Sequence, residues 1–265
     1  MTENIQVNDR PVVFGLPALW NESFQAHSDV YHALDRVQLV ADDLIKATQD
    51  DKSDLVEVLR ALTSVNNAGM TDVVILTGNR RGAGAMKVAR SMFEVSITAE
   101  YLEKNPAETD LYLDFAHVIA WKHLQDLERK SPGKVPPEHK RQSETQYNRV
   151  KAKFEKNGKV RNNWTDKTIK KLAEAIGPDR ANLYEVIYGL ASELHHVNVA
   201  GLIGHELEWA SEALRVGHGA LLQTLVSLYN TYHKPGTEFR ERINELVKDF
   251  DRVWKEHVTA RDRKP

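Results

Sequence analysis

The chain contains no cysteine among its 265 residues. This absence excludes disulfide bonds, thiolate nucleophiles and the zinc or iron–sulfur sites that cysteine forms, and it fits a reducing compartment. The first ten residues have neither a basic start nor an apolar stretch, so they do not resemble a secretory signal. Uninterrupted apolar runs stay far below the roughly 20 residues that a membrane-spanning helix needs. We therefore expect a cytoplasmic protein without a membrane partner.

A large net charge is also lacking, since the formal charge is -2 at pH 7 with neutral histidine. The overall charge therefore gives no reason to expect nucleic acid as a partner. Hydrophobic residues make up 41% and charged residues 28%, which is typical of a globular protein. The length suffices for one large domain with an inserted excursion.

Strand patterns are scarce, because apolar and polar residues seldom alternate. Apolar residues instead recur at intervals of three and four, which indicates amphipathic helices. We predict an all-α fold with a single domain of seven to nine helices over 17–265, after an irregular segment 1–16. Helices after the first, which begins near Pro17, are expected at about 55–67, 85–104, 108–129, 138–157, 165–176, 179–196, 206–232 and 237–260.

One stretch competes with this interpretation. The run 72–78 is rich in β-branched residues, and the glycine-rich run 79–84 precedes a predicted helix, which is the layout of a phosphate-binding loop. The chain lacks the Gly-Lys-Ser/Thr ending that such a loop requires, and Lys87 stands where a dinucleotide fingerprint needs its third glycine. We therefore interpret 72–84 as a helix end and a glycine link into the next helix.

Arg90 and Glu94 lie where the central helix should be apolar. On a period of 3.6 residues they share one helix face with Met86, Phe93 and Ile97. A charged pair in an apolar stripe is costly unless it is paired and hydrogen-bonded. The pair therefore indicates either a structural network or a functional site.

Two further helices carry polar residues on or beside apolar faces. Asp114 lies on the face of Leu111 and Phe115, and His117 lies on a second face of the same helix. The other helix carries four polar residues on one face, followed by His196: Tyr184, Tyr188, Ser192 and His195. If the three helices pack together, these groups converge with the charged pair. The simpler interpretation is structural: the polar side chains are buried and hydrogen-bond to one another, which holds the helices together. A functional site would in addition require a groove open to solvent.

Metal ligands do not occur in a convincing pattern. Residues 193–196 supply one Glu-x-x-His copy, whereas a helical di-iron bundle needs two copies on facing helices. Adjacent His195 and His196 point about 100° apart on a helix, so they do not readily serve one ion. We expect no metal and no other cofactor.

The segment 129–161 is strongly basic. It contains eleven Lys or Arg and three Glu, a local charge of +8, so the rest of the chain sums to -10. Tyr147, Phe154 and Trp164 lie in or beside it, and basic residues interleaved with aromatics are able to track a phosphate backbone and stack bases. The candidate contacts to RNA or DNA are Lys140, Arg141, Arg149, Lys151, Lys153 and Lys156. The alternative is a solvated helix that docks on the acidic remainder or on a second copy. We expect 129–165 to form a basic helical hairpin that leaves the domain as an excursion.

Three blocks occur in a recognisable order. They are Arg90-x-x-x-Glu94 with 101–106, the Trp164-to-Gly177 block, and the Tyr184-to-His195 block. Their order and spacing resemble an uncharacterised all-helical prokaryotic family catalogued as a domain of unknown function, over about 55–200. The resemblance implies that Arg90, Glu94, Tyr184, Tyr188, Ser192 and His195 lie together, and it supplies no activity. His196 stands where the family often has a small residue or proline.

A second, weaker similarity is to HEPN domains, which carry Arg and, four to six residues later, His. Arg252 and His257 supply one match, which is no more than chance predicts for so short a motif, and Val253 departs from the usual polar neighbour. We interpret both residues as part of a solvated helix face.

Three functions remain open from the sequence. In the first, the polar cluster and the basic segment bind or cleave nucleic acid as a metal-independent ribonuclease. Arg90 would hold a phosphate, Glu94 would orient, and His195 would act as general acid or base. In the second, the chain is a non-catalytic module for self-association or partner binding, and the cluster is structural. In the third, it is a carboxylate and histidine metal-binding bundle.

Overall fold

The computed structural model describes residues 5–7, 10–12, 17–195, 206–232 and 237–262, and side chains within 17–189, 209–232 and 238–257. Two short strands, β1 (Ile5–Val7) and β2 (Arg10–Val12), pair antiparallel near the N-terminus. The α-helices of the described residues are α1 (Pro17–Ala47), α2 (Asp54–Gly78), α3 (Gly82–Lys104), α4 (Thr109–Lys130), α5 (Pro137–Val150), α6 (Ile169–Ile176), α7 (Pro178–His195), α9 (Glu206–Thr231) and α10 (Thr237–Asp262). The predicted all-α single-domain fold is confirmed.

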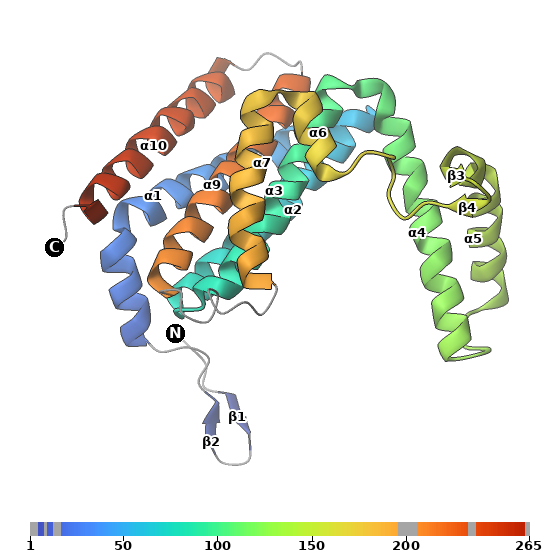
Figure 1. Cartoon of the computed structure of the whole chain (residues 1–265), viewed down its shortest axis with the longest axis horizontal. Helices are drawn as coiled ribbons and strands as arrows, with labels where there is room; N and C mark the ends of the chain where they lie inside the picture. The colour runs from blue at the N-terminus through green and yellow to red at the C-terminus, as the bar shows by residue number, and fades with distance from the viewer. Residues whose placement is uncertain (1–4, 8–9, 13–16, 196–205, 233–236, 263–265) are drawn as a thin grey trace.

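Helix α3 lies at the centre of the body of the molecule (Figure 1). It packs most extensively against α9 and α2, and it also contacts α6 and α7, while α1 and α10 lie together on the other side of α9. Its residues from Ser96 to Leu102 are all buried, in line with the low charge that predicted a helix buried on most sides. One continuous apolar core therefore surrounds the helix that carries Arg90 and Glu94.

Helix α2 begins and ends with clear local signals. The Ser53 side chain accepts a hydrogen bond from the amide of Val56 and caps the first turn. The helix continues through the β-branched run 72–78, so this run is helical and the phosphate-loop alternative is wrong. Gly78 lies against Trp20, whose ring atoms would stand 2.7 Å from an added Cβ. Glycine is therefore needed here for close packing on α1, not for binding phosphate.

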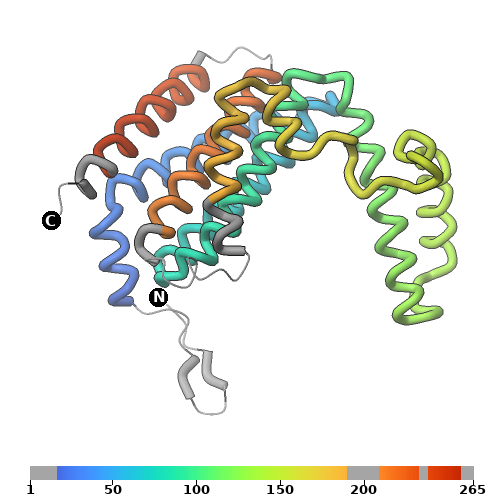
Figure 2. Tube along the Cα trace, viewed as in Figure 1, coloured from blue at the N-terminus to red at the C-terminus, as the bar shows by residue number. Residues whose placement is uncertain are grey.

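Residues 109–161 form an arm that projects from the body (Figure 2). The arm consists of α4, α5, a 3-10 turn η2 (Lys151–Phe154) and a two-stranded hairpin of β3 (Glu155–Lys156) and β4 (Lys159–Val160). A small apolar cluster of its own holds it together: Phe115, Val118, Val150 and Phe154. Trp164 packs on both this cluster and the main core, so it joins the arm to the body.

Several predicted boundaries were wrong. The excursion starts with α4 rather than at residue 129, because apolar residues of α4 pack on α5 and η2. Helix α5 ends at Val150 rather than near 157, since Asn157 and Gly158 adopt positive φ angles and form the turn of the β3–β4 hairpin. The segment 1–16, expected to be irregular, contains the β1–β2 pair, whose isoleucine and valines favour extended backbone.

The part of the chain that the structure describes includes no helix both long and apolar enough to cross a membrane.

Candidate functional site

Arg90 and Glu94 of α3 meet Tyr184 and Tyr188 of α7. Arg90 Nε lies 3.3 Å from Glu94 Oε1, and its guanidinium carbon lies 3.8 Å from the centroid of the Tyr188 ring. The Tyr184 and Tyr188 rings stack with centroids 4.7 Å apart. The structure therefore brings together four of the residues that the sequence assigned to one cluster.

The geometry of this cluster suits a role in holding α3 and α7 together. The side chains of Arg90 and Glu94 are 16% and 34% exposed, so the pair is only partly removed from water. Burial, then the neighbouring Tyr188 and Glu94, raise the pKa of Tyr184 to about 12, so its phenol remains protonated at neutral pH. The Arg90 guanidinium is already engaged by a carboxylate and an aromatic face, which leaves less of it for a phosphate.

The other predicted cluster residues of α7, and His196 after it, are not among the described side chains. Helix α7 extends through His195, but the side chains of Ser192 and His195 are not among those described, and neither is His196. Whether a histidine completes the cluster is therefore a prediction that stays open.

Asp114 and His117 lie in the arm and face its own residues, contrary to the convergence that the sequence suggested. Asp114 Oδ2 accepts an ion-paired hydrogen bond from Lys153 Nζ at 2.5 Å. Arg149 Nη2 lies 3.5 Å from His117 Nε2. A helix face specifies that a residue is covered but not by which helix, and here η2 and α5 cover α4.

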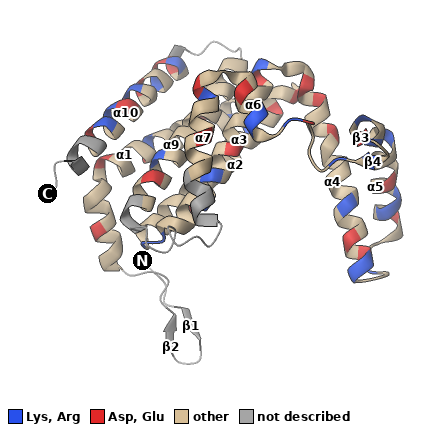
Figure 3. Cartoon of the chain, in the orientation of Figure 1, with Lys and Arg blue, Asp and Glu red and all other residues tan. Residues whose placement is uncertain are grey.

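The basic residues of the arm lie at its surface, as Figure 3 shows by the blue segments along α4 and α5. Lys140, Arg141, Arg149, Lys153 and Lys156 are exposed, and Lys151 is partly exposed. Arg141 pairs with Glu138 and Lys153 with Asp114, so these two cations are partly neutralised. The arm thus presents a basic surface whose predicted residues are open to solvent.

A buried ion pair escaped the sequence analysis. Arg180 Nε of α7 donates to Glu100 Oε2 of α3 at 2.6 Å, and Arg180 also donates to the Gln223 side chain of α9. The side chains of Glu100 and Arg180 are 11% and 22% exposed. Glu100 stands three residues after buried Ile97, so the argument that singled out Glu94 applied equally to it.

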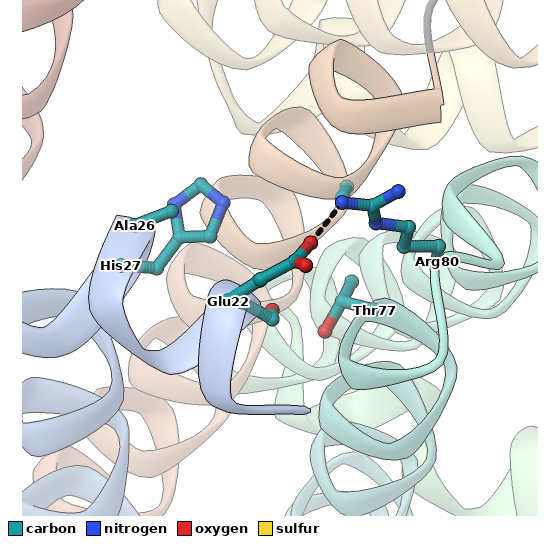
Figure 4. Close-up of a pocket in the computed structure, with 7 residues that line it drawn as sticks. Glu22, Ala26, His27, Thr77 and Arg80 are labelled. Carbon is teal, nitrogen blue, oxygen red and sulfur yellow. Dashed lines mark hydrogen bonds and ion pairs between the residues drawn. The ribbon is translucent and has the colours of Figure 1, made fainter. Parts of the chain in front are cut away.

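A small pocket of about 120 Å³ lies beside a kink in α1 (Figure 4). The kink is at buried His27, whose backbone is non-helical, and Glu22 pairs with Arg80 across α1 and the end of α2. The His27 ring lies 4.9 Å from that of His257, and His257 Nε2 lies 2.8 Å from Ser211 Oγ. The C-terminal helix face expected to be wholly solvated therefore packs at His257.

Arg252, on the same helix, is exposed and pairs with Asp249 and Glu256, as a solvated face would. Among the described residues no group of three or more histidine and acidic side chains is placed to hold a metal ion. The sequence segment 196–205, with His196 and His205, lies outside that search.

Comparison with known proteins gives one match. The model of a family of unknown function (DUF5677) matches residues 58–209, more than half of the chain. The matched region contains both the Arg90 cluster and the whole arm. No curated protein and no solved structure matches the chain. Nothing in these comparisons connects it to HEPN domains.

Proposed function

Because the chain belongs to DUF5677, a family of unknown function, we propose its function from its own geometry: the arm binds the phosphate backbone of nucleic acid. The arm lies entirely inside the matched region, so the proposal concerns a part of the chain that the family model covers. We place this activity in the cytoplasm, in line with the absence of cysteine.

The observation that carries the proposal is a set of unneutralised cations on the arm. Five of its lysines are exposed and make no ion pair within the described part of the chain: Lys130, Lys134, Lys140, Lys156 and Lys159. When a lysine neutralises a phosphate, the counterion held by that phosphate is released from the nucleic acid. This release supplies affinity that does not depend on sequence. The body carries the compensating negative charge, so an anionic partner is favoured on the arm over the rest of the surface.

The aromatic residues of the arm favour backbone contacts over base stacking. Trp121 stacks on Tyr147 with centroids 5.8 Å apart, and Phe115 packs on Phe154 at 5.2 Å. Phe115, Phe154 and Tyr147 belong to the arm's own cluster and Trp121 is buried, so these rings offer little free face to an unpaired base. We therefore propose a double-stranded partner, RNA or DNA, read by its phosphates rather than its sequence.

The free lysines lie near both ends of α5. Lys130, Lys134 and Lys140 surround the α4–α5 turn, and Lys156 and Lys159 lie in the β3–β4 hairpin. The 14 residues of α5 span about 21 Å along the helix axis. Two basic ends at this separation fit one duplex contacted at two places along its backbone.

Cleavage is the finer part of the proposal and depends on His195 as general acid or base. Arg90 is better suited to bracing α3 against α7, since Glu94 and Tyr188 already engage it. If His195→Ala leaves duplex binding unchanged and removes a strand-cutting activity seen in the wild type, cleavage gains support. If the wild type does not cut the duplex, cleavage is refuted and only the binding proposal remains.

Two triple variants with the same change of net charge test the binding proposal. The first replaces Lys140, Lys156 and Lys159 of the arm with Glu. The second replaces three exposed lysines of the body that make no ion pair within the described residues: Lys46, Lys87 and Lys248. Affinity for a fluorescein-labelled duplex of about 20 base pairs is measured by anisotropy at low salt, beside one of its strands alone.

We expect the arm variant to lose at least about tenfold in affinity and the body variant less than about threefold. The wild type should bind the duplex more tightly than the single strand. Equal losses in the two variants would mean that only net charge matters and would refute a specific role of the arm. Absence of wild-type binding at low salt would refute the proposal and favour a helical module for self-association or partner binding.

A further inference from the structure

A cleft of about 260 Å³ lies between α7, α9 and α10, away from the arm. Helices α7 and α9 both pack on α3, and Phe93 of α3, which is 2% exposed, is among the lining residues. The cleft therefore reaches the core. Its walls are mostly apolar and include Ile187 of α7, Val226 of α9 and Phe250 of α10.

The polar residues that line the cleft are Arg180, Arg215 and Gln223, and none of the described lining residues is Asp or Glu. Arg180 is held by Glu100 behind it and by Gln223. Arg215 donates through Nε and Nη2 to Glu212, three residues earlier on α9. Each guanidinium has five donors, and the described bonds use Nε and Nη2 of each, so donors remain for a ligand.

Arg180 and Arg215 reach the cleft at different levels of α9. Arg180 contacts Gln223, and Arg215 stands eight residues before Gln223 on the same helix, about 12 Å along its axis. A molecule bound in the cleft would thus contact apolar side chains and, at separate points along α9, two cations. Both side chains are already fixed by their partners, so little ordering would be needed on binding.

We propose that this cleft binds a small amphipathic anion, with an apolar body inside and a carboxylate or similar oxyanion on Arg215 or Arg180. The volume lies just below the range of about 300–1,000 Å³ typical of small-molecule sites, which favours a compact ligand. A protein partner would need about 1,200 Å² of buried surface, far more than the cleft offers. The site is independent of the basic arm and goes beyond nucleic-acid binding.

Octanoate is the probe, with octan-1-ol as its uncharged match and octylammonium as its cationic match. Binding of each to the full chain is measured by isothermal titration calorimetry. We expect octanoate to bind about tenfold more tightly than octan-1-ol, because charge-assisted hydrogen bonds to guanidinium are added to the same apolar contact. Octylammonium should bind most weakly.

Two variants separate the charge from the cavity. Arg215→Gln should weaken octanoate about tenfold and leave octan-1-ol unchanged, since the charge-assisted bonds are lost and the walls remain. Gly219→Leu should abolish binding of both, because its side chain fills the cleft. A Cβ there would lie 3.5 Å from Phe250, an ordinary contact that the helix accommodates. Arg149→Gln on the arm is the matched control and should change nothing.

Melting curves followed by circular dichroism check that each variant is folded. If Arg215→Gln melts early, Arg215→Lys replaces it and should weaken octanoate at least about threefold while leaving octan-1-ol unchanged, because the ammonium lacks the fork of donors that bonds Glu212 and the ligand together. Equal affinity for octanoate and octan-1-ol, octanoate binding that survives Gly219→Leu, or no octanoate binding at millimolar concentration would each overturn the proposal.

Discussion

At the residue scale, α3 carries two carboxylates of different burial, each paired with a largely buried arginine. Glu94 pairs with Arg90 on its own helix, and about a third of its side chain remains in contact with water. Glu100 pairs with Arg180 of α7 and is nearly buried. Water screens the first pair and largely not the second, so the same substitution should have different costs.

We expect Glu94→Ala to lower the free energy of unfolding by about 1 kcal/mol, the value of a pair that water partly screens. Glu100→Ala should lower it by more, about 3 kcal/mol, because the removed carboxylate is only 11% exposed and pairs with both Arg180 and Lys104. Urea unfolding followed by circular dichroism measures both. Similar costs for the two variants would mean that the difference in burial has no energetic weight.

His218 gives the molecule a pH dependence. Burial and, to a smaller extent, the Arg36 cation lower its pKa to about 4, and Asp249 partly opposes this shift. Below pH 6.5 the unfolded chain therefore binds a proton that the folded chain excludes, so stability falls as the pH drops from about 6.5 to about 4. The full loss is on the order of 3 kcal/mol, at 1.36 kcal/mol per pKa unit.

His218→Gln removes this titration and keeps an acceptor for the Trp254 indole, which donates to His218 Nδ1 at 3.3 Å. Unfolding free energies of both proteins are measured between pH 4 and 7.5. The wild type should lose more stability than the variant across this window. Parallel curves would show that His218 is protonated equally in both states.

The sequence located the charged pair but not its whole environment. Arg90 and Glu94 were identifiable because charge on an apolar helix face is rare and must be explained. The family resemblance implied that Tyr188 lies near the pair, though not that its ring contacts Arg90, and the assignment of Asp114 and His117 to the same cluster was wrong. Helical periodicity gives the covered face of an element and carries no information on which element covers it.

At the element scale, the arm has a separate apolar cluster. Phe154 of η2 is buried against Phe115 of α4, and the Arg161 guanidinium lies 5.3 Å from the Phe154 ring. Only Trp164 belongs both to this cluster and to the main core among the described residues. A substitution that destabilises the arm should therefore unfold the arm without unfolding the body.

We expect Phe154→Ala to open the arm, since removing a buried phenylalanine typically costs about 3–5 kcal/mol. Amide hydrogen exchange should lose protection in 109–161 and keep it in α2, α3 and α9. Phe239→Ala on α10, which packs at the edge of the main core, is the control and should leave the arm protected. Uniform loss of protection after Phe154→Ala would show that arm and body unfold as one unit.

Element positions were well predicted where apolar periodicity was strong. The expected ranges for α3, α4, α7, α9 and α10 agree with the structure to within three residues at each end. The predicted end of α5 was wrong because the residues there are compatible with two kinds of local structure. Asn157-Gly158 ends helices and also forms tight hairpin turns, and the sequence did not show that Phe154 just before it packs into the arm's cluster. Membership of a family of unknown function, expected over about 55–200, is confirmed over 58–209.

At the scale of the whole molecule, charge and shape divide in the same way. The arm, residues 109–161, has twelve Lys or Arg and seven Asp or Glu, a net charge of +5, so the rest of the chain sums to -7, and the arm projects away from the helical body (Figure 3). A net charge near zero therefore conceals a dipolar molecule. The net charge gave no reason to expect nucleic acid, whereas the basic run 129–161 and its position on the arm favour it.

The salt dependence of duplex binding tests this account most directly. With five free lysines on phosphates, the slope of log affinity against log salt for duplex DNA should be about -4.5, since each neutralised phosphate contributes about -0.9. Replacing Lys140, Lys156 and Lys159 with Gln should bring the slope to about -2. A shallow wild-type slope, or a steep slope that the three substitutions leave unchanged, would contradict the assignment of the arm as the binding surface.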